Sequence, residues 1–232
     1  MSGGWFITGT DTGVGKTRVA ERLLRALVRQ KLQAVGMKPV ASGCRLTAAG
    51  RRSEDAERLL AAGNVSAEYA EVNPYAFAPA IAPHLAAHQE NLEIGLPRIL
   101  ETFRRLRRRA DWIVVEGVGG WKVPLAERLL LTDIVRAMRL PVIVVVGMRL
   151  GCLNHALLTA EAIRHDGIPL AGWIANQIDP DMARVEVNIA ALESRIAAPL
   201  LARFPYETPG NENASNFVFP SDAVMRLTQK VD

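Results

Sequence analysis

Short runs of apolar residues alternate along the chain with longer stretches in which apolar residues recur at a helical period. The run Ile143-Val144-Val145-Val146 is β-branched and uninterrupted, as expected of a strand buried on both faces of a parallel sheet. The pattern therefore predicts an α/β fold, a doubly wound, mainly parallel sheet with helices on both faces. The expected strands are 5–8, 34–37, 112–115, 142–146, 170–175 and 200–204.

No internal repeat or low-complexity linker divides the chain, so residues 1–232 are expected to form a single domain. Residues 64–89 read as a loop, because they contain Asn73-Pro74, Pro79 and Pro83. Either a lid or a buried excursion fits this segment, and the pattern does not choose between them. The expected helices are 17–30, 54–62, 96–109, 133–139, 154–166, 182–196 and 221–229.

The composition narrows the class of protein. Hydrophobic residues make up 49% of the chain and charged residues 22%, which is typical of a globular protein. The longest mainly apolar run, 140–148, is about half as long as a membrane-spanning helix, so no membrane partner is expected. The first residues lack a signal-peptide pattern, which predicts a cytoplasmic protein. Cys44 and Cys152 lie far apart, so neither a zinc site nor a disulfide framework is expected.

The charge balance gives little support to nucleic-acid binding. The net charge is +4, and the one dense basic block is 104–109. This block ends a predicted helix, where cations complement the helix dipole and face solvent. Because no aromatic residues are interleaved with the arginines, we expect no nucleic-acid partner.

The first predicted strand leads into Gly-Thr-Asp-Thr-Gly-Val-Gly-Lys-Thr, residues 9–17. A strand that ends in a glycine-rich turn and opens a helix directs backbone N–H groups at an anion, which indicates a P-loop fold of the NTP-binding type. Lys16 can reach the outer phosphates, and Thr17 can bind magnesium. Five residues, not the usual four, separate Gly9 from Gly15, so the loop is a variant. A plain glycine turn is the alternative, and it leaves Lys-Thr at the helix start unexplained.

A second magnesium ligand is expected where another central strand ends. The strand 112–115 is followed by Glu116 and then by the glycine-rich run 117–120. A carboxylate at this edge of an open α/β sheet is typical of phosphoryl-transfer sites. The alternative is a glycine turn that happens to follow an acidic residue.

Two further candidates have competing explanations. Asp55 lies just after Ser53, so it could be a metal ligand or simply an acidic residue in the first turn of a helix. Lys38 and Ser42 follow the second predicted strand and reach the same sheet edge. A lysine at a strand end can equally be a solvated surface charge.

Together these motifs resemble the dethiobiotin synthetases, ATP-dependent enzymes of biotin biosynthesis. The resemblance extends over almost the whole chain, and the five-residue loop spacing combined with Lys-Pro-Val-Ala-Ser-Gly is specific. It implies a homodimeric ligase that converts 7,8-diaminononanoate, carbon dioxide and magnesium ATP into dethiobiotin, ADP and phosphate. A carbamate and a carbamic-phosphoric anhydride are the implied intermediates. The segments that carry the resemblance are 9–17, 38–43, 72–75, 115–121, 151–156 and 171–176.

The resemblance also implies roles for individual residues. Lys38 pairs with the carbamate, and Lys16 bridges the carbamate and the phosphates, so these two are the implied catalytic residues. Thr17, Asp55 and Glu116 hold magnesium. Thr12 and Ser42 help to bind the diamine, and the turn formed by Gly151, Cys152, Leu153 and Asn154 binds its carboxylate across the dimer interface. Nucleotide binding is implied for Gly13, Val14, Gly15, Lys16, Thr17, Arg18, Asp55, Glu116, Gly117, Val118, Gly119, Asn176, Gln177, Pro205, Tyr206, Glu207 and Glu212.

The chain departs from the family pattern in two places. Gly13 stands where some members carry an acid, and 209–213 matches only loosely, so the adenine contacts from 205 onward transfer least well. The main rival function is a nucleotide-dependent partition or positioning switch. Its loop carries a signature lysine at the position that Asp11 occupies here. An amidating synthetase is a second rival, but 232 residues leave no room for its glutamine-hydrolysing domain.

Overall fold

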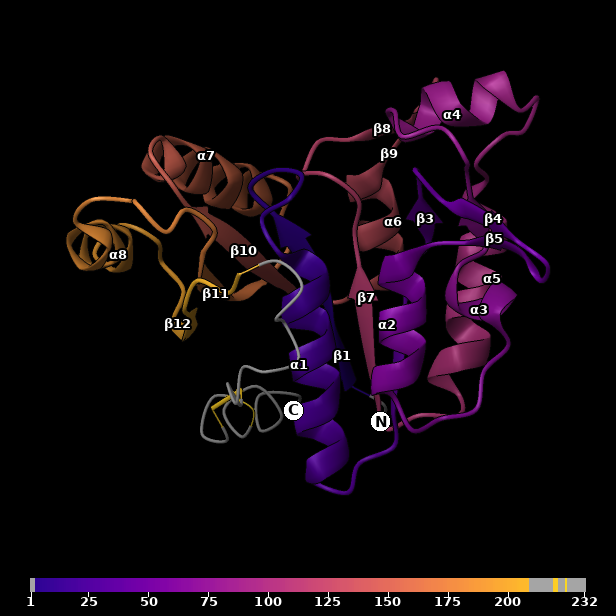
Figure 1. Cartoon of the computed structure of the whole chain (residues 1–232), viewed down its shortest axis with the longest axis horizontal. Helices are drawn as coiled ribbons and strands as arrows, with labels where there is room; N and C mark the ends of the chain where they lie inside the picture. The colour runs from indigo at the N-terminus through magenta and orange to yellow at the C-terminus, as the bar shows by residue number, and fades with distance from the viewer. Residues whose placement is uncertain (1–2, 209–218, 221–223, 225–232) are drawn as a thin grey trace.

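The computed structural model describes residues 3–208, 219, 220 and 224, and within them a six-stranded parallel sheet forms the centre (Figure 1). Its strand order, β12-β11-β10-β1-β7-β2, is doubly wound around β1, which confirms the predicted fold class. All six predicted strands are present, some of them longer than expected. They are β1 (Gly3–Gly9), β2 (Ala34–Met37), β7 (Trp112–Glu116), β10 (Val142–Met148), β11 (Leu170–Gln177) and β12 (Leu200–Phe204).

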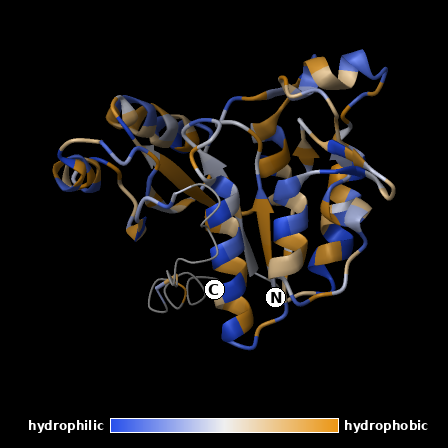
Figure 2. Cartoon of the chain, in the orientation of Figure 1, coloured by the Kyte–Doolittle hydropathy of each residue, from blue (hydrophilic) through white to orange (hydrophobic). Residues whose placement is uncertain are grey.

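Helices cover both faces of this sheet. One face packs against α1 (Lys16–Arg29) and α2 (Glu54–Ala62). The other packs against α5 (Leu96–Arg107), α6 (Leu131–Met138), α7 (Cys152–His165) and α8 (Val185–Glu193). Figure 2 shows hydrophobic residues along β7 and a mixture of hydrophobic and polar residues along α1, as expected for a buried strand and an amphipathic helix. No helix in the described ranges is both long and apolar enough to span a bilayer.

Several predicted helix boundaries are wrong. Helix 54–62 has the predicted bounds, whereas α6 begins two residues before the predicted 133. The prediction 182–196 is too long at both ends, because Arg184 adopts a left-handed backbone (φ 56°) and α8 begins only after it. Helix α7 starts at Cys152 rather than 154, directly after the left-handed Gly151. The predicted helix 221–229 lies outside the described residues apart from 224.

The segment 64–89 is more ordered than its prolines predict. It contains α3 (Tyr69–Val72), the short strand β6 (Tyr75–Ala76) and α4 (Pro83–Gln89). Strand β6 pairs in parallel with β3 (Val40–Ala41). The buried Asn73 side-chain amide donates to the carbonyl of Lys38 at 2.7 Å, which ties the segment to the end of β2. Its middle is therefore a buried excursion.

Two small hairpins complete the described elements. The first pairs β4 (Arg45–Thr47) with β5 (Gly50–Arg52), and the second pairs β8 (Pro124–Ala126) with β9 (Leu129–Leu130). The second hairpin continues the glycine-rich run after β7 and leads directly into α6. It therefore limits how far that run can move from the sheet edge.

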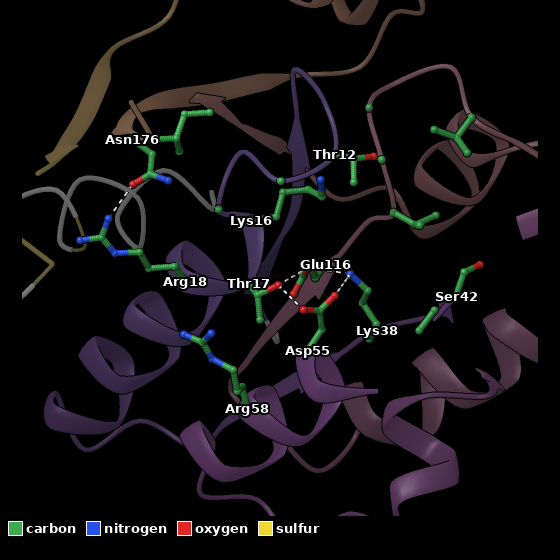
Figure 3. A pocket seen from close by; sticks show the side chains of 18 of the residues that line it. Thr12, Lys16, Thr17, Arg18, Lys38, Ser42, Asp55, Arg58, Glu116 and Asn176 are labelled. Carbon is green, nitrogen blue, oxygen red and sulfur yellow. Dashed lines mark hydrogen bonds and ion pairs between the residues drawn. The ribbon is translucent and has the colours of Figure 1, made fainter. Parts of the chain in front are cut away.

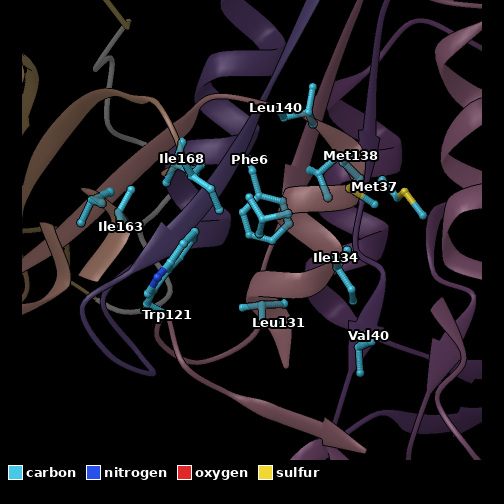
Figure 4. Packing of buried hydrophobic residues seen from close by; sticks show 14 of the residues in the cluster. Phe6, Met37, Val40, Trp121, Leu131, Ile134, Met138, Leu140, Ile163 and Ile168 are labelled. Atoms are coloured by element: carbon cyan, nitrogen blue, oxygen red, sulfur yellow. The ribbon is translucent and has the colours of Figure 1, made fainter. Parts of the chain in front are cut away.

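The side chains of β1 alternate between two cores. Trp5 stacks on Trp112 with ring centroids 4.4 Å apart on the side of α1, and Ile7 lies on the same side. Phe6 points to the opposite side, where Figure 4 shows it beside residues of α6 such as Leu131 and Ile134. The strand is thus held from both faces, so the loop that follows it starts from a rigid position.

Asp166, which directly follows α7, anchors the two residues that come after the glycine-rich run. Its carboxylate accepts hydrogen bonds from Trp121 Nε1 at 2.7 Å and from Lys122 Nζ at 2.7 Å. Burial acts to raise the pKa of Asp166, but these hydrogen bonds and the charge of Lys122 outweigh it, and the net pKa is lowered. The folded state therefore favours the ionised carboxylate.

We expect Asp166→Ala to lower the free energy of unfolding at pH 7 by about 1–3 kcal/mol, because the Trp121 indole loses its acceptor. Since the folded-state pKa is lowered, the contribution is complete above the unfolded-state pKa near ~4 and is lost as pH falls through the folded-state value. Urea denaturation at a series of pH values measures this difference. Glu161→Ala, which removes an exposed carboxylate from the same helix, is the control and should change stability by less than about 0.5 kcal/mol. Equal losses in the two variants would contradict the anchoring role.

Candidate active site

A cavity of about 970 Å³ opens at the carboxyl ends of β1, β2, β7 and β11 (Figure 3). Loops after parallel strands meet at this edge, where open α/β sheets bind ligands. Most of the predicted site residues line the cavity together. They are Thr12, Gly13, Gly15, Lys16, Thr17, Arg18, Lys38, Ser42, Asp55, Glu116, Val118, Gly119, Asn176, Gln177, Tyr206 and Glu207.

The loop between β1 and α1 is built for close approach by a ligand. Gly13 and Gly15 have φ values of 73° and 89°, a region that favours glycine. A Cβ at Gly15 would lie 2.1 Å from the Asn176 side-chain nitrogen, so this position has no room for a side chain. No side chain caps the N-terminus of α1, which leaves its first amides for an anion.

Lys16 crosses the loop, and its Nζ donates to the carbonyl of Asp11 at 2.9 Å. The ammonium is buried and lies near Lys38. Burial and, next, repulsion from Lys38 lower the pKa of Lys16 to about 8, although Glu116 and Asp55 partly oppose the shift. An anion bound in the loop would favour the protonated ammonium.

Three oxygen-bearing side chains converge at the start of α1. Thr17 Oγ1 lies 2.7 Å from Asp55 Oδ1 and 2.8 Å from Glu116 Oε1. Ser53 caps α2 and thereby places Asp55 in its first turn, while Glu116 is the last residue of β7. A hydroxyl has one hydrogen and donates one full hydrogen bond at a time, so these two carboxylates compete for it.

Lys38 supplies the positive charge between the same carboxylates. Its Nζ lies 2.6 Å from Glu116 Oε1, 2.7 Å from Asp55 Oδ2 and 3.0 Å from the carbonyl of Gly117. Burial acts to lower the pKa of Lys38, but the two carboxylates outweigh it and the net pKa is raised. Burial acts to raise the pKa of Asp55, and the Lys38 charge outweighs this and lowers it. Burial dominates at Glu116 and raises its pKa.

The three oxygens fit a magnesium ion. Glu116 Oε2 is buried and has no hydrogen-bond partner among the described residues, so it has unused acceptor capacity. The same part of the chain holds no cluster of three or more His, Cys, Asp or Glu side chains suited to a metal. Magnesium does not require one, because it is commonly held by one or two carboxylates together with phosphate oxygens and water.

The far end of the cavity lies between α1, β11 and the residues after β12. Asn176 is buried, and its Nδ2 donates to the carbonyl of Val14 at 2.8 Å. Arg18 donates to Asn176 Oδ1 at 2.8 Å and to the carbonyl of Pro205 at 2.9 Å. Tyr206 and Glu207 complete this end.

Some predicted residues do not face the cavity. Val14, Gly117 and Pro205 do not line it, and Glu212 lies outside the described residues. The turn 151–154 does not line the cavity of its own chain. It is linked to the phosphate loop through Arg149, two residues before Gly151, whose guanidinium lies 2.6 Å from Asp11 Oδ2.

Two parts of the wall were not predicted from the sequence. Arg58 lines the cavity and binds Glu21 Oε2 through Nε at 2.9 Å and a terminal nitrogen at 2.8 Å. Its position three residues after Asp55 on a predicted helix could have revealed it, because residues at that spacing share a face. The second part is apolar and gave no local signal. It consists of Ala41, Ala80, Ile81, Ala82, Pro83, Val123 and Ile178.

Comparison with known proteins shows which family this chain resembles. Residues 4–213 match the family described as AAA domain. The ATP-dependent dethiobiotin synthetase BioD of Pseudomonas aeruginosa strain UCBPP-PA14 is 52% identical over 202 residues, covering 87% of this chain and 89% of that protein. The enzyme of the same name from Xanthomonas axonopodis pv. citri is 50% identical over 211 residues, covering 91% and 94%.

Among solved structures, the MinC:MinD cell division protein complex of Aquifex aeolicus matches with a TM-score of 0.60. The match covers 99% of this chain and 96% of that chain, at 15% identity. An identity this low shows a shared fold and no more.

We expect Lys38→Met to destabilise the protein by about 3–5 kcal/mol, because the buried Glu116 and the partly exposed Asp55 lose their shared cation. Magnesium should restore part of this loss by neutralising the same carboxylates. Thermal unfolding with and without magnesium measures both effects, and the magnesium-dependent rise in Tm should be larger in the variant than in the unmodified protein. Lys31→Met, which removes an exposed lysine, is the control and should show no such difference. The magnesium assignment would be wrong if the ion stabilised neither protein.

Proposed function

The chain belongs to the family of ATP-dependent dethiobiotin synthetases, and on that premise we propose that it closes a cyclic urea from 7,8-diaminononanoate, carbon dioxide and ATP. The observation that carries the proposal is the convergence of two buried lysines and two carboxylates beside the phosphate loop. A phosphoryl transfer to a carbamate needs this balance of charge, because both reactants are anionic.

The reaction has three chemical steps. One amine of the diamine adds carbon dioxide and loses a proton, which gives a carbamate. A carbamate oxygen attacks the γ-phosphorus, and ADP leaves. The second amine then attacks the carbamoyl carbon and loses a proton, and the breaking C–O bond releases phosphate and dethiobiotin.

The lysines have different proposed roles. Lys38 is held protonated by its carboxylate partners, so it can present a fixed cation to the carbamate. Lys16, on the phosphate loop, neutralises the outer phosphates and the carbamate oxygen that approaches them. Thr17, Asp55 and Glu116 are the proposed magnesium ligands, and the bound ion would supply charge neutralisation for the phosphates. Geometry, not covalent participation, is the main contribution of these side chains.

The remainder of the cavity suits an alkyl diamine. Ala41, Ile81 and Val123 line the cavity and offer apolar surface against which a hydrocarbon chain can lie. Ser42 Oγ is buried in the cavity wall without a hydrogen-bond partner among the described residues, and Thr12, in the phosphate loop, also lines the cavity. We assign both hydroxyls to the diamine end of the substrate.

The proposed nucleotide site runs from the loop to the far end of the cavity. The amides from Gly13 to Arg18 would cradle the phosphates, and Gly117 to Gly119 allow backbone to approach them. Asn176, Gln177 and the segment 205–207 would surround the base. The rival role as a partition or positioning switch has less support, because Asp11 replaces its signature lysine and pairs with Arg149.

We also propose a homodimer in which the partner completes the substrate site. The turn 151–154 offers helix-start amides to an anion but does not line its own cavity. Two leucines near it are exposed, Leu150 at 95% and Leu158 at 57%, and in the proposed dimer a second subunit would cover them. The proposed compartment is the cytoplasm, where ATP is available and the free thiols Cys44 and Cys152 stay reduced.

The purified protein should release ADP only when diamine, dissolved carbon dioxide and magnesium are all present. Lys16→Gln should lower kcat/KM for ATP by about 100-fold or more, because the cation on the transferred phosphoryl group is lost. Lys38→Gln should lower kcat while nucleotide affinity changes little. A coupled ADP assay and calorimetric titration with a nonhydrolysable ATP analogue separate the two effects.

Lys31→Gln is the matched control for both variants and should leave the kinetics unchanged. Circular dichroism must first show that each variant is folded. ADP release that is independent of the diamine would contradict the proposed reaction, and an equal loss of nucleotide affinity in both lysine variants would contradict their separate roles.

Sedimentation should show a dimer, and Leu150→Glu combined with Leu158→Glu should shift it towards monomer. The monomeric variant should keep its nucleotide affinity but raise KM for the diamine by about tenfold or more, because the partner's turn is absent. Leu46→Glu, at an exposed leucine on another hairpin, is the control. A folded monomer with unchanged KM would refute the shared site.

A further inference from the structure

Arg18 connects three segments at the far end of the cavity. It lies in the first turn of α1, and its side chain is only 11% exposed. The guanidinium donates to Asn176 Oδ1 on β11 and to the carbonyl of Pro205 after β12, at 2.8 and 2.9 Å. It also lies over the Phe204 ring and forms an ion pair with Glu207 at 2.5 Å. Figure 3 shows the contact between Arg18 and Asn176. Few side chains of this site are held from so many directions.

These contacts fix which way the Asn176 amide faces. Its oxygen accepts from Arg18, and its nitrogen donates to the carbonyl of Val14 at 2.8 Å. If the amide rotated by half a turn, its NH₂ group would face the guanidinium and its oxygen would face a carbonyl. Both new contacts would be repulsive. One N–H and one oxygen lone pair of the amide remain available to a ligand, and the positions of this donor and this acceptor are fixed.

This arrangement of donor and acceptor matches purines that carry a 6-amino group. An asparagine amide recognises adenine by donating to N7 and accepting from the 6-amino group. A 6-oxo purine has an acceptor at both positions, so the fixed amide oxygen would face another oxygen. Without Arg18 only the Val14 carbonyl would oppose rotation of the amide about its terminal bond, since such bonds have broad preferences.

Glu207 keeps Arg18 in place. Its side chain is only 8% exposed, and Arg22 lies 3.9 Å from the same oxygen that Arg18 contacts. The carboxylate also offsets the charge of the Arg18 guanidinium. Tyr206, which lines the cavity, lies between Pro205, whose carbonyl accepts from Arg18, and Glu207, whose carboxylate pairs with it.

We propose that Arg18 is a positioning residue for base selectivity, and that it makes the site prefer 6-amino over 6-oxo purine nucleotides by fixing the orientation of the Asn176 amide. The inference rests on the proposed function, since it requires a purine nucleotide in this cavity. It adds a determinant that the phosphate loop motif does not contain, because Arg18 follows the last residue of that motif.

Binding of ATP and ITP, which differ only at the 6-position and the N1 proton of the base, tests the proposal. Calorimetric titration without the diamine measures binding whether or not ring closure occurs, so failure of the proposed reaction is detected separately. The unmodified protein should bind ATP at least about tenfold more tightly than ITP. Arg18→Ala should reduce this ratio of affinities by about tenfold or more.

A double-variant cycle shows whether Arg18 acts through Asn176. Asn176→Ala should also lose selectivity, and adding Arg18→Ala should reduce the ATP:ITP ratio no further. Arg18→Lys should restore part of the selectivity, since lysine keeps a donor. Arg29→Ala, an exposed arginine at the other end of α1, should leave the ratio unchanged.

Three results would overturn the proposal: equal binding of ATP and ITP by the unmodified protein, an unchanged ratio in folded Arg18→Ala, or additive effects of the two substitutions. A general loss of affinity for both nucleotides at a constant ratio would mean that Arg18 is only structural.

Discussion

The ammonium of Lys38 is buried between the carboxylates of Asp55 and Glu116, and the surrounding structure serves to keep it there. A charge taken out of water must be paired, or it destabilises the fold by several kcal/mol. The three side chains come from the end of β2, the start of α2 and the end of β7. Their pairing therefore requires that two neighbouring strands and a helix end within a few ångströms of one another.

The backbone makes this approach possible. A Cβ on Gly36 would lie 2.7 Å from Leu59 Cβ, so a glycine in β2 lets α2 pack closely against the strand. Ser53 then caps α2 and leaves Asp55 beside Lys38. The same principle operates at Gly15, which leaves room for the Asn176 amide. Small residues near the site thus control distances between charged and polar groups, not only backbone conformation.

The central strands and the phosphate loop could be predicted because their signals are local. A β-branched run such as 143–146, or glycines followed by Lys16 and Thr17, carries its meaning within a few residues. The segment 64–89 could not be predicted well, since Asn73 orders it by bonding to Lys38, 35 positions away in sequence. Arg18 likewise gained its partners at Asn176 and Pro205 only through folding. The chemical roles of the site residues remain predictions, because position alone does not establish them.

The strand order also has a consequence for synthesis on the ribosome. Strand β1 ends at Gly9, yet its two neighbours in the sheet begin at Trp112 and Val142. At roughly 5–20 residues per second, on the order of 10 s separates the emergence of β1 from that of its last neighbour. During this interval an apolar strand with two open edges has no native partner. The nascent chain must therefore be shielded, by its own early helices or by a chaperone, until its middle has been made.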